Sequence, residues 1–237
     1  MRFFALTVAA CFSAVMMPAM AQEVSGNARL GYLASSGNVD ETNLSAEGEI
    51  AFDFLSWRHQ ASASAIFSEV EDETTRERYT AGVQSDYKLS EISYLFATIN
   101  FEKDRFSGID QRFSEALGYG RTLYQTETIK LDGEIGPGAR QTRYIEDDGS
   151  IRKEDELIGR GKIKFAWQIS ENNSFREKLL VEAGDQNTFA ESVTTFRSQI
   201  NKRLFVDLSY TIKHNTDVPS DRENTDRYTS LSLGYEL

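Results

Sequence analysis

Two histidines and one cysteine are the residues of this 237-residue sequence best suited to acid–base or nucleophilic chemistry. His214 stands in the segment KHNTD (213–217), with Asp217 and Asp221 close behind it. A histidine base oriented by a carboxylate is the arrangement that hydrolases use to activate a serine. A single histidine in a polar loop is more often a solvated side chain, so we predict no catalytic residue and a protein that is not an enzyme. A hydrolase with its site near His214 stays open as an alternative.

Two glycine-containing segments fail as cofactor or metal motifs. GPGARQ (136–141) lacks the third glycine and the following helix of a dinucleotide-binding fingerprint. Its Gly136 and Gly138 are instead expected to point inward and leave room there, while Pro137 removes one ladder hydrogen bond. EDDGSIRKEDE (146–156) places its glycine after too few ligand positions for a calcium loop. We therefore predict neither a cofactor nor a metal site.

The N-terminal segment MRFFALTVAACFSAVMMPAMA has the order of a secretory signal peptide: an early cation, an apolar stretch and a small-x-small end. We predict that 1–21 is cleaved and that 22–237 forms one domain. Cleavage removes Cys11, the sole cysteine, so the mature chain has no disulfide and no thiolate zinc site. The sequence carries a net charge of −11, which argues against nucleic-acid binding.

Cations alternate with apolar residues in the segment GRGKIKFAWQIS (159–170). The even positions carry three cations and the odd positions three large apolar residues, namely Arg160, Lys162 and Lys164 against Ile163, Phe165 and Trp167. Period-2 alternation places the two kinds of side chain on opposite faces of a strand. The two faces of this strand are therefore expected to meet two different solvents.

The same alternation recurs along the whole mature chain, in segments of about ten residues or more. Strands in ordinary soluble sheets are shorter, with a typical length of about 5–6 residues. We expect twelve strands, at 26–35, 41–54, 57–69, 77–89, 93–105, 111–124, 128–143, an eighth that contains 159–170, 174–184, 190–202, 204–215 and 226–237.

The connections between these segments alternate between short and long. SEIS (90–93) and SENN (170–173) are short, whereas EDETTRER (71–78), IEDDGSIRK (145–153) and NTDVPSDREN (215–224) are longer and polar. Short turns at one rim, long loops at the other and an even strand number are typical of outer-membrane barrels. We therefore predict an all-β, 12-stranded antiparallel transmembrane β-barrel of outer-membrane type, with a soluble periplasmic β-sandwich as the alternative.

The cost of charge in lipid decides which face of each strand is which. A lysine or arginine that faces lipid near the midplane costs about 2–4 kcal/mol. Three of them in 159–170 would together cost about as much as the whole stability of a domain. We therefore expect the cations to face the lumen and their apolar neighbours to face lipid. Aromatic residues near the short turns are expected at the membrane interface, namely Trp57, Tyr87, Tyr94, Trp167, Phe175 and Tyr235.

The inward positions give the expected lumen a basic wall and an acidic wall. The basic wall comprises Lys130, Arg160, Lys162, Lys164, Arg176 and Lys178. The acidic wall comprises Glu47, Glu49, Asp53, Asp86, Glu102, Asp104, Asp132 and Glu134. Two interpretations stay open. The walls form a salt-bridge network that fills the interior, or they line a narrow aqueous path that favours small polar or zwitterionic solutes.

Three segments carry a resemblance to a known family: GYLASSGNVDETNLSAEGEI (31–50), GEIGPGARQTRY (133–144) and YTSLSLGYEL (228–237). They resemble the N-terminal hairpin, a mid-chain Gly-x-Gly strand and the closing strand of the YdiY-like salt-induced outer-membrane proteins, a domain of unknown function. The resemblance implies an outer-membrane location and a link to salt or envelope stress, and it supplies no catalytic residues. The chain departs from the usual pattern at Leu237, where outer-membrane strands typically end on an aromatic residue.

These features together predict a non-enzymatic protein of the bacterial outer membrane, with narrow passive solute passage through a charged lumen. Its expected partners are outer-membrane lipid, lipopolysaccharide and, through the C-terminal strand, the barrel-assembly machinery. An outer-membrane hydrolase with a site at the extracellular rim near His214 and a soluble periplasmic β-sandwich are the alternatives.

Overall fold

A computed structural model describes residues 22–36, 41–70, 73–104, 107–146, 148–220 and 222–237 of the chain. The strands are β1 (Glu23–Ser36), β2 (Glu41–Asp53), β3 (Trp57–Val70), β4 (Glu73–Lys88), β5 (Ser93–Asp104), β6 (Ile109–Gln125), β7 (Ile129–Ile145), β8 (Ile151–Gln168), β9 (Asn173–Gly184), β10 (Thr188–Gln199), β11 (Leu204–Asn215) and β12 (Thr225–Glu236).

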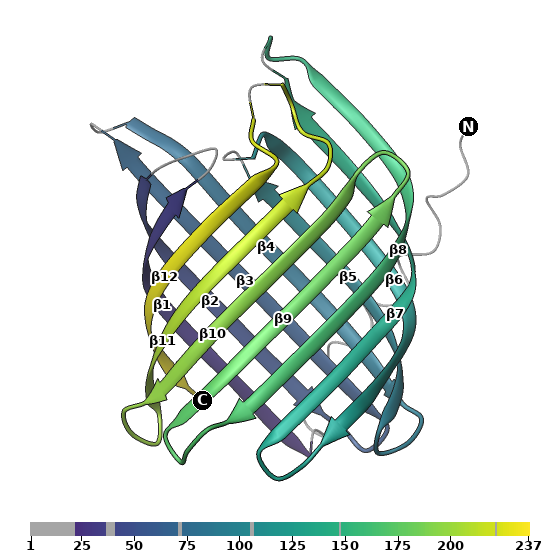
Figure 1. The fold of residues 1–237 in the computed structure, drawn as a ribbon, viewed down its shortest axis with the longest axis vertical. Coiled ribbons are helices and arrows are strands. Elements are labelled where there is room, and N and C mark those ends of the chain that lie inside the picture. The colour runs from purple at the N-terminus through teal and green to yellow at the C-terminus, as the bar shows by residue number, and fades with distance from the viewer. Residues whose placement is uncertain (1–21, 37–40, 71–72, 105–106, 147, 221) are drawn as a thin grey trace.

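All twelve strands belong to one closed barrel (Figure 1). Each strand pairs antiparallel with its neighbours in the sequence, and β1 pairs with β12 to close the sheet. The predicted 12-stranded antiparallel barrel is confirmed. Within the described residues, no helix is long and apolar enough to cross a membrane.

The connections at one rim are uniformly short. They cover residues 54–56, 89–92, 126–128, 169–172 and 200–203, and the C-terminus lies at the same rim (Figure 1). The longest connection, residues 216–224, lies at the opposite rim, and in outer-membrane barrels the short turns face the periplasm and the longer loops are extracellular. We therefore call this end the periplasmic rim and the opposite end the extracellular rim.

Two of the predicted extracellular loops are partly strand. The structure assigns 73–78 to β4 and 151–153 to β8, so both hairpins continue past the positions at which we expected them to end. β7 and β8 pair as far as Ile145 and Ile151, and their hairpin rises above the rest of the rim in Figure 1. Polar composition marks the end of the apolar band and not the end of the strand, because backbone pairing does not require apolar side chains.

Side chains alternate between the interior and the outer surface along every strand. In β12, Ser230 and Ser232 are buried, whereas Leu231 and Leu233 between and beyond them are exposed. Exposed leucine, isoleucine and valine side chains recur on the outward positions of the other strands. An apolar outer surface with a polar interior is the inverse of a soluble β-protein and fits a barrel surrounded by lipid.

Gly136 and Gly138 allow the backbones of β6 and β7 to approach closely. They do not leave the free space in the lumen that we had predicted. A Cβ atom on Gly136 would lie 2.1 Å from the carbonyl oxygen of Leu117, and one on Gly138 would lie 2.4 Å from that of Glu115. The backbone of β6 therefore occupies the room that we predicted these glycines to leave inside. The β6–β7 register is the same on both sides of Pro137, so the residue marks no register shift.

A lysine at Ile163 tests which face of β8 meets lipid. Ile163 lies on the outward face and is 44% exposed. We expect Ile163→Lys to lower the free energy of unfolding by about 2–4 kcal/mol, the cost of a cation near the bilayer midplane. Urea unfolding in lipid vesicles measures this value. The control is Ile169→Lys in a periplasmic turn, for which we expect a loss below about 1 kcal/mol. Equal losses at the two positions would contradict the assignment.

Candidate functional site

The barrel interior contains a cavity of about 1270 Å³ that residues from all twelve strands line. At the periplasmic rim its lining includes turn residues such as Thr126 and Glu171. Toward the extracellular rim the lining ends at a layer that contains Arg78, Glu102, Arg112, Phe189, Lys213 and Tyr228. The cavity therefore reaches deep into the barrel from the periplasmic side.

A polar network joins opposite parts of the wall at mid-height. The Glu134 carboxylate lies 2.6 Å from Lys162 Nζ and 3.6 Å from Arg160 Nη1. It also accepts hydrogen bonds from Gln84 and from the Tyr94 hydroxyl, each at 3.0 Å. Lys162 in turn donates to Gln84 Oε1 at 2.8 Å. The network links β4 and β5 to β7 and β8, so side chains fill this side of the lumen.

A second network covers the wall that runs from β10 through β11, β12 and β1 to β2. Arg29 lies 3.2 Å from Glu47, 2.9 Å from Glu49 and 3.4 Å from Asp207. Asp207 also accepts two hydrogen bonds from the Arg197 guanidinium, both at 2.8 Å. Such a bidentate pair fixes the geometry of both side chains.

A third network forms the upper end of the cavity. Arg78 lies 3.2 Å from both Glu102 and Asp104, and Arg112 lies 3.5 Å from Glu102. Lys213 on β11 also pairs with Glu102 on β5. Because β5 and β11 lie on opposite sides of the closed sheet, this contact spans the barrel.

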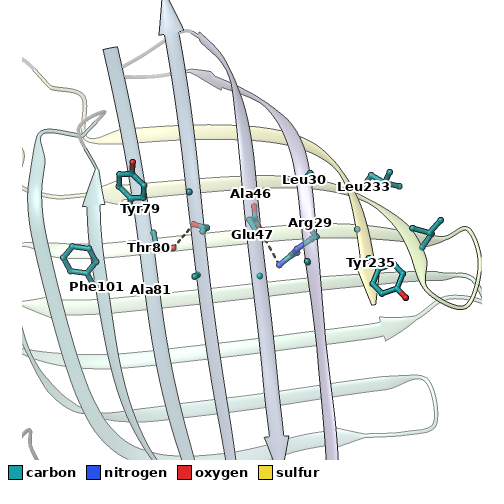
Figure 2. Close-up of a pocket in the computed structure, with 17 residues that line it drawn as sticks. Arg29, Leu30, Ala46, Glu47, Tyr79, Thr80, Ala81, Phe101, Leu233 and Tyr235 are labelled. Atoms are coloured by element: carbon teal, nitrogen blue, oxygen red, sulfur yellow. Dashed lines mark hydrogen bonds and ion pairs between the residues drawn. The ribbon is translucent and has the colours of Figure 1, made fainter. Parts of the chain in front are cut away.

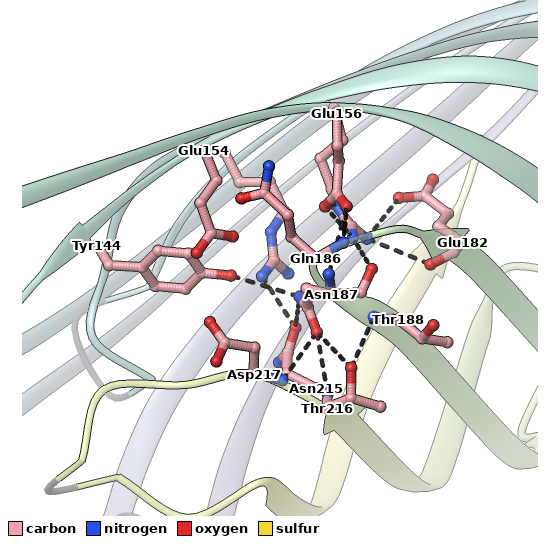
Figure 3. Close-up of polar contacts among 12 residues, drawn as sticks. Tyr144, Glu154, Glu156, Glu182, Gln186, Asn187, Thr188, Asn215, Thr216 and Asp217 are labelled. Carbon is pink, nitrogen blue, oxygen red and sulfur yellow. Dashed lines mark hydrogen bonds and ion pairs between the residues drawn. The ribbon is translucent and has the colours of Figure 1, made fainter.

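Above that layer, the β9–β10 turn folds over the lumen through Asn187, whose side chain is buried (Figure 3). Asn187 Nδ2 donates to the Tyr144 hydroxyl at 3.3 Å and to Asn215 Oδ1 at 3.0 Å. Its Oδ1 accepts from the Thr216 amide at 2.9 Å and hydroxyl at 3.2 Å, and from the Asp217 amide at 3.2 Å. One side chain thus ties the β9–β10 turn to β7 and to the β11–β12 connection.

Arg140 supports the same turn from below. Its side chain is fully buried, lies 2.6 Å from the Glu156 carboxylate and donates to the backbone carbonyl of Asn187. Glu156 also accepts hydrogen bonds from the amides of Gln186 at 3.0 Å and Asn187 at 3.3 Å. We call these residues and those bonded to the Asn187 side chain the extracellular cover. Among the described residues, the cover separates the cavity from the extracellular rim over β7–β11.

The residues predicted for the acidic and basic walls lie partly along the cavity, and several of them pair with each other. Ten predicted residues line the cavity, namely Lys130, Arg160, Lys162, Lys164, Arg176, Lys178, Glu47, Glu49, Glu102 and Asp132. Four others do not line it, namely Asp53, Asp86, Asp104 and Glu134. Acidic and basic residues meet across the lumen, because most inward cations sit beside a carboxylate. Charges therefore neutralise each other locally.

The acidic residues that do not line the cavity have partners in the wall or at a rim. Asp53 pairs with Arg58 at 2.6 Å and with Lys88 at the periplasmic rim. Asp86 is buried and accepts a hydrogen bond from Gln84 at 2.8 Å. Asp132, which does line the cavity, is also paired, because it lies 3.4 Å from Lys130. These contacts favour structural roles for the three carboxylates.

The predicted interface aromatics all lie near the periplasmic rim, and all but one face outward. Trp57 packs against Tyr87 with ring centroids 5.0 Å apart, and Trp167 pairs in register with Phe175. Tyr235 accepts a hydrogen bond from Arg203 at 2.5 Å on the outer surface. These residues form an outward-facing belt at this end of the barrel.

Tyr94 is the exception, since the interface assignment is wrong for this residue. It points into the lumen and donates to Glu134. Its even position on β5 gives it the same face as Glu102 and Asp104, which the alternation had already placed inside. Its place near a turn predicts a membrane-interface residue, whereas its even position predicts an inward one, and the even position is decisive.

Among the described residues, His214 has no carboxylate partner. His214 is exposed, and its Nδ1 atom lies 2.9 Å from the Thr225 hydroxyl. Asp217 pairs instead with Arg152 at 2.8 Å, and Asp221 lies outside the described residues. The described residues therefore do not assemble a histidine–carboxylate pair here.

An apolar groove of about 800 Å³ runs across the outer surface of β1–β4 (Figure 2). Its floor consists of small residues, namely Ala28, Ala46, Gly48, Ala63, Ala65 and Ala81. Tyr79 and Phe101 border one side, and Leu233 and Tyr235 border the other. Lipid acyl chains fit such an apolar surface.

Several residues of the site escaped sequence reasoning. Asn187 and Arg140 gave no signal beyond polarity, because their roles depend on a turn that folds inward. Gln84 lies on the inward face of β4, but its contact with Lys162 joins positions 78 residues apart, which local sequence does not reveal. Parity finds inward residues, whereas only the closed barrel selects which of them meet.

A closed antiparallel barrel with an even strand number, an apolar outer surface, aromatic residues at its rim and a charged interior is an outer-membrane-type β-barrel. The chain belongs to the DUF481 family of proteins of unknown function, whose model matches residues 28–237. It is 31% identical over 230 residues to the uncharacterized protein YdiY of Escherichia coli (strain K12), covering 95% of this chain and 88% of that protein. The predicted membership of a YdiY-like family is confirmed.

Solved structures with the same fold are outer-membrane barrels. The NanC porin matches with a TM-score of 0.59 and 10% identity, covering 89% of this chain and 100% of the porin. An outer membrane channel from Pseudomonas putida F1 matches with a TM-score of 0.53 and 11% identity, covering 93% and 97%. The translocator domain of the autotransporter NalP from Neisseria meningitidis matches with a TM-score of 0.52 and 12% identity, covering 95% and 92%. At these identities the similarity concerns the fold alone.

Proposed function

We propose that this protein is a non-enzymatic barrel of the bacterial outer membrane that permits limited passage of small polar solutes through its lumen. The observation that carries the proposal is the cavity of about 1270 Å³, which reaches from the periplasmic rim to the Arg78–Glu102 layer. Charged side chains line it, so water and polar solutes are its natural contents. Passage then requires displacement of the Lys213–Glu102 contact and, over β7–β11, of the extracellular cover.

The shape of the interior favours a narrow path for solutes and not a wide pore. Twelve strands enclose a smaller interior than the 16–18 strands of open porins. The Glu134 and Arg29 networks narrow it further, because both project into the lumen. The two sequence interpretations thus combine: ion pairs fill part of the interior, and the remaining space forms the solute path.

The route to the membrane belongs to the same proposal. A signal peptide over 1–21 would direct export, and cleavage would leave 22–237 to insert as the barrel. β12 carries outward Leu231, Leu233 and Tyr235, an alternation suited to recognition by the barrel-assembly machinery. The outer surface would contact lipid and lipopolysaccharide. A role under salt or envelope stress is proposed from the family resemblance alone and is tested by the protein level after a salt shift.

Planar-bilayer recording tests the proposed function. We expect purified, folded protein to give discrete conductance steps smaller than those of a 16-stranded porin in the same salt, because its interior is narrower. Heat-modifiable migration on a denaturing gel confirms folding of the sample. A silent bilayer with folded, inserted protein would overturn solute passage and favour a filled structural barrel.

A further inference from the structure

Two cations in the lumen stand apart from the rest because they have no ion pair. Thirteen inward-facing cations of the described residues lie within 4.0 Å of a carboxylate, namely Arg29, Arg58, Arg78, Lys88, Arg112, Lys130, Arg140, Arg152, Arg160, Lys162, Lys178, Arg197 and Lys213. Within the same described part of the chain, Lys164 and Arg176 have neither a salt bridge nor a side-chain hydrogen bond. Both line the cavity.

The strand register brings these two cations together with a third. Lys164 on β8 lies directly opposite Lys178 on β9, and Arg176 lies opposite Ala166, two positions further toward the periplasmic rim. Like charges directly opposite each other destabilise a sheet. Of the three cations, Lys178 has a carboxylate partner, Glu191, at 2.8 Å. The patch therefore carries an excess of positive charge that the fold itself leaves uncompensated.

The nearest inward positions do not supply the missing anion. Arg176 is flanked across the sheet by Ala166 and by Thr195, and neither carries a charge. Lys164 faces Asp132 across β7 and β8, but Asp132 lies beside Lys130 at 3.4 Å and accepts a hydrogen bond from Thr122 at 2.7 Å. The two cations are thus available to a ligand.

The wall across the lumen is also neutralised. β2 lies six strands from β8 in the closed barrel, and its Glu47 and Glu49 both pair with Arg29. Asp86 and Glu134 interact electrostatically with Lys164, and Glu49 and Asp207 with Arg176, but among the described residues none of these carboxylates lies within 4.0 Å of either cation. A low-dielectric wall around a cavity focuses such a field on whatever enters.

The position of the patch sets the side from which a ligand arrives. Lys164 lies four residues from the periplasmic end of β8, and Arg176 lies three residues after the start of β9. The Lys162–Glu134 contact lies immediately above them. The patch thus occupies the periplasmic half of the cavity, below both the mid-height network and the extracellular cover.

We propose that Lys164 and Arg176 form a binding site for the oxyanion group, carboxylate or phosphate, of a small solute in the periplasmic half of the lumen. An arginine guanidinium offers paired donors that match an oxyanion, and a neighbouring lysine adds a mobile point charge. The proposal deepens the proposed function by naming its substrate class and rests on it only for the solute's passage. Binding requires access from the periplasmic rim and not conduction.

A double substitution tests binding directly. Isothermal titration of the detergent-folded protein with inorganic phosphate, and separately with malonate, is expected to detect binding of at least one of the two anions. In the Lys164→Gln and Arg176→Gln double variant, we expect the affinity to fall at least about tenfold, because both charge-assisted partners are lost. The matched control, Lys202→Gln and Arg203→Gln in the exposed β10–β11 turn, is expected to keep the affinity. No binding to the wild type, or equal affinity in the double variant, would overturn the site.

Bilayer recording separates this site from the proposed function. In a potassium chloride gradient, the wild type is expected to prefer chloride, and Lys164→Glu with Arg176→Glu is expected to shift the reversal potential toward cation preference. A conducting barrel whose selectivity does not change would overturn the anion site and leave passage standing. A silent bilayer combined with lost binding in the glutamine variant would overturn passage and leave the site standing. Heat-modifiable migration verifies folding, which removal of like charges is not expected to impair.

Discussion

Asn187→Ala is expected to raise the open probability of the barrel in a planar bilayer at least about tenfold. The Asn187 side chain makes five hydrogen bonds to Tyr144, Asn215, Thr216 and Asp217. Each such bond contributes about 0.5–1.5 kcal/mol net. Loss of even two of them shifts the equilibrium about tenfold, since about 1.4 kcal/mol is a factor of ten. The measurement is the fraction of time spent in the conducting state.

Gln186→Ala is the matched control for the Asn187 prediction. Gln186 lies next to Asn187 in the same turn, but its side chain is exposed, and its contact with Glu156 uses the backbone amide, which alanine retains. We expect this variant to open as often as the wild type. If Asn187→Ala conducts with an unchanged open probability, the β9–β10 turn is not the barrier to passage, and the narrow section lies lower in the lumen.

The largest effect on stability is expected at Glu134. Its carboxylate pairs with Lys162 and Arg160 and accepts hydrogen bonds from Gln84 and Tyr94. Glu134→Ala leaves two buried cations without their shared anion, and removal of one partner of a buried ion pair costs about 3–5 kcal/mol. We expect a loss of this size in the free energy of unfolding, measured by urea titration in lipid vesicles.

Two further variants sharpen the Glu134 prediction. Glu134→Gln keeps the side-chain shape and one acceptor oxygen but removes the charge, so its loss is expected to fall below that of Glu134→Ala. Glu171→Ala in an exposed periplasmic turn removes a carboxylate outside the network and is expected to change stability by less than about 0.5 kcal/mol. Equal stability of Glu134→Ala and the wild type would mean that the mid-height network does not hold the barrel together.

The Glu134 network and the patch of Lys164 and Arg176 differ in whether their charges are paired. The Glu134 network ties β4 and β5 to β7 and β8 and fills that side with paired charges. The patch of Lys164 and Arg176 lies below it and leaves charge free. Most charges of the lumen have partners inside the protein, whereas Lys164 and Arg176 have none among the described residues, and we propose that these two bind a solute. We therefore assign a structural or a ligand-binding role to each charged side chain by whether it has an ion-pair partner, and not by its residue type.

Strand positions and faces followed from the sequence alone. The expected strand at 204–215 coincides with β11, and Ile163 lies outside while Lys162 and Lys164 lie inside, as alternation predicted. The physical reason is that a one-residue slip would expose every cation of a strand to lipid. The exclusion of cations from lipid acts on each strand separately, so the inward face of a strand can be predicted from its local sequence.

The odd or even position of a residue in its strand also predicts the correct face for Tyr94, where the interface assignment fails. Tyr94 shares its face with Glu102, and alternation alone would have placed it inside. The rule that aromatic residues near turns belong to the membrane interface describes a tendency of outward positions. It says nothing about an inward tyrosine whose hydroxyl finds a carboxylate such as Glu134.

The tertiary structure alone decided which charges meet. The contact between Arg112 and Asn215 joins residues 103 positions apart, and that between Lys213 and Glu102 joins residues 111 apart. Both depend on the stagger of twelve strands around a closed barrel and on side chains long enough to span it. The sequence by itself determined a charged interior. Closure of the sheet decided that most of this charge is paired, that Asn187 covers one end, and that Lys164 and Arg176 remain free, because these outcomes depend on distances across the lumen that no local pattern contains.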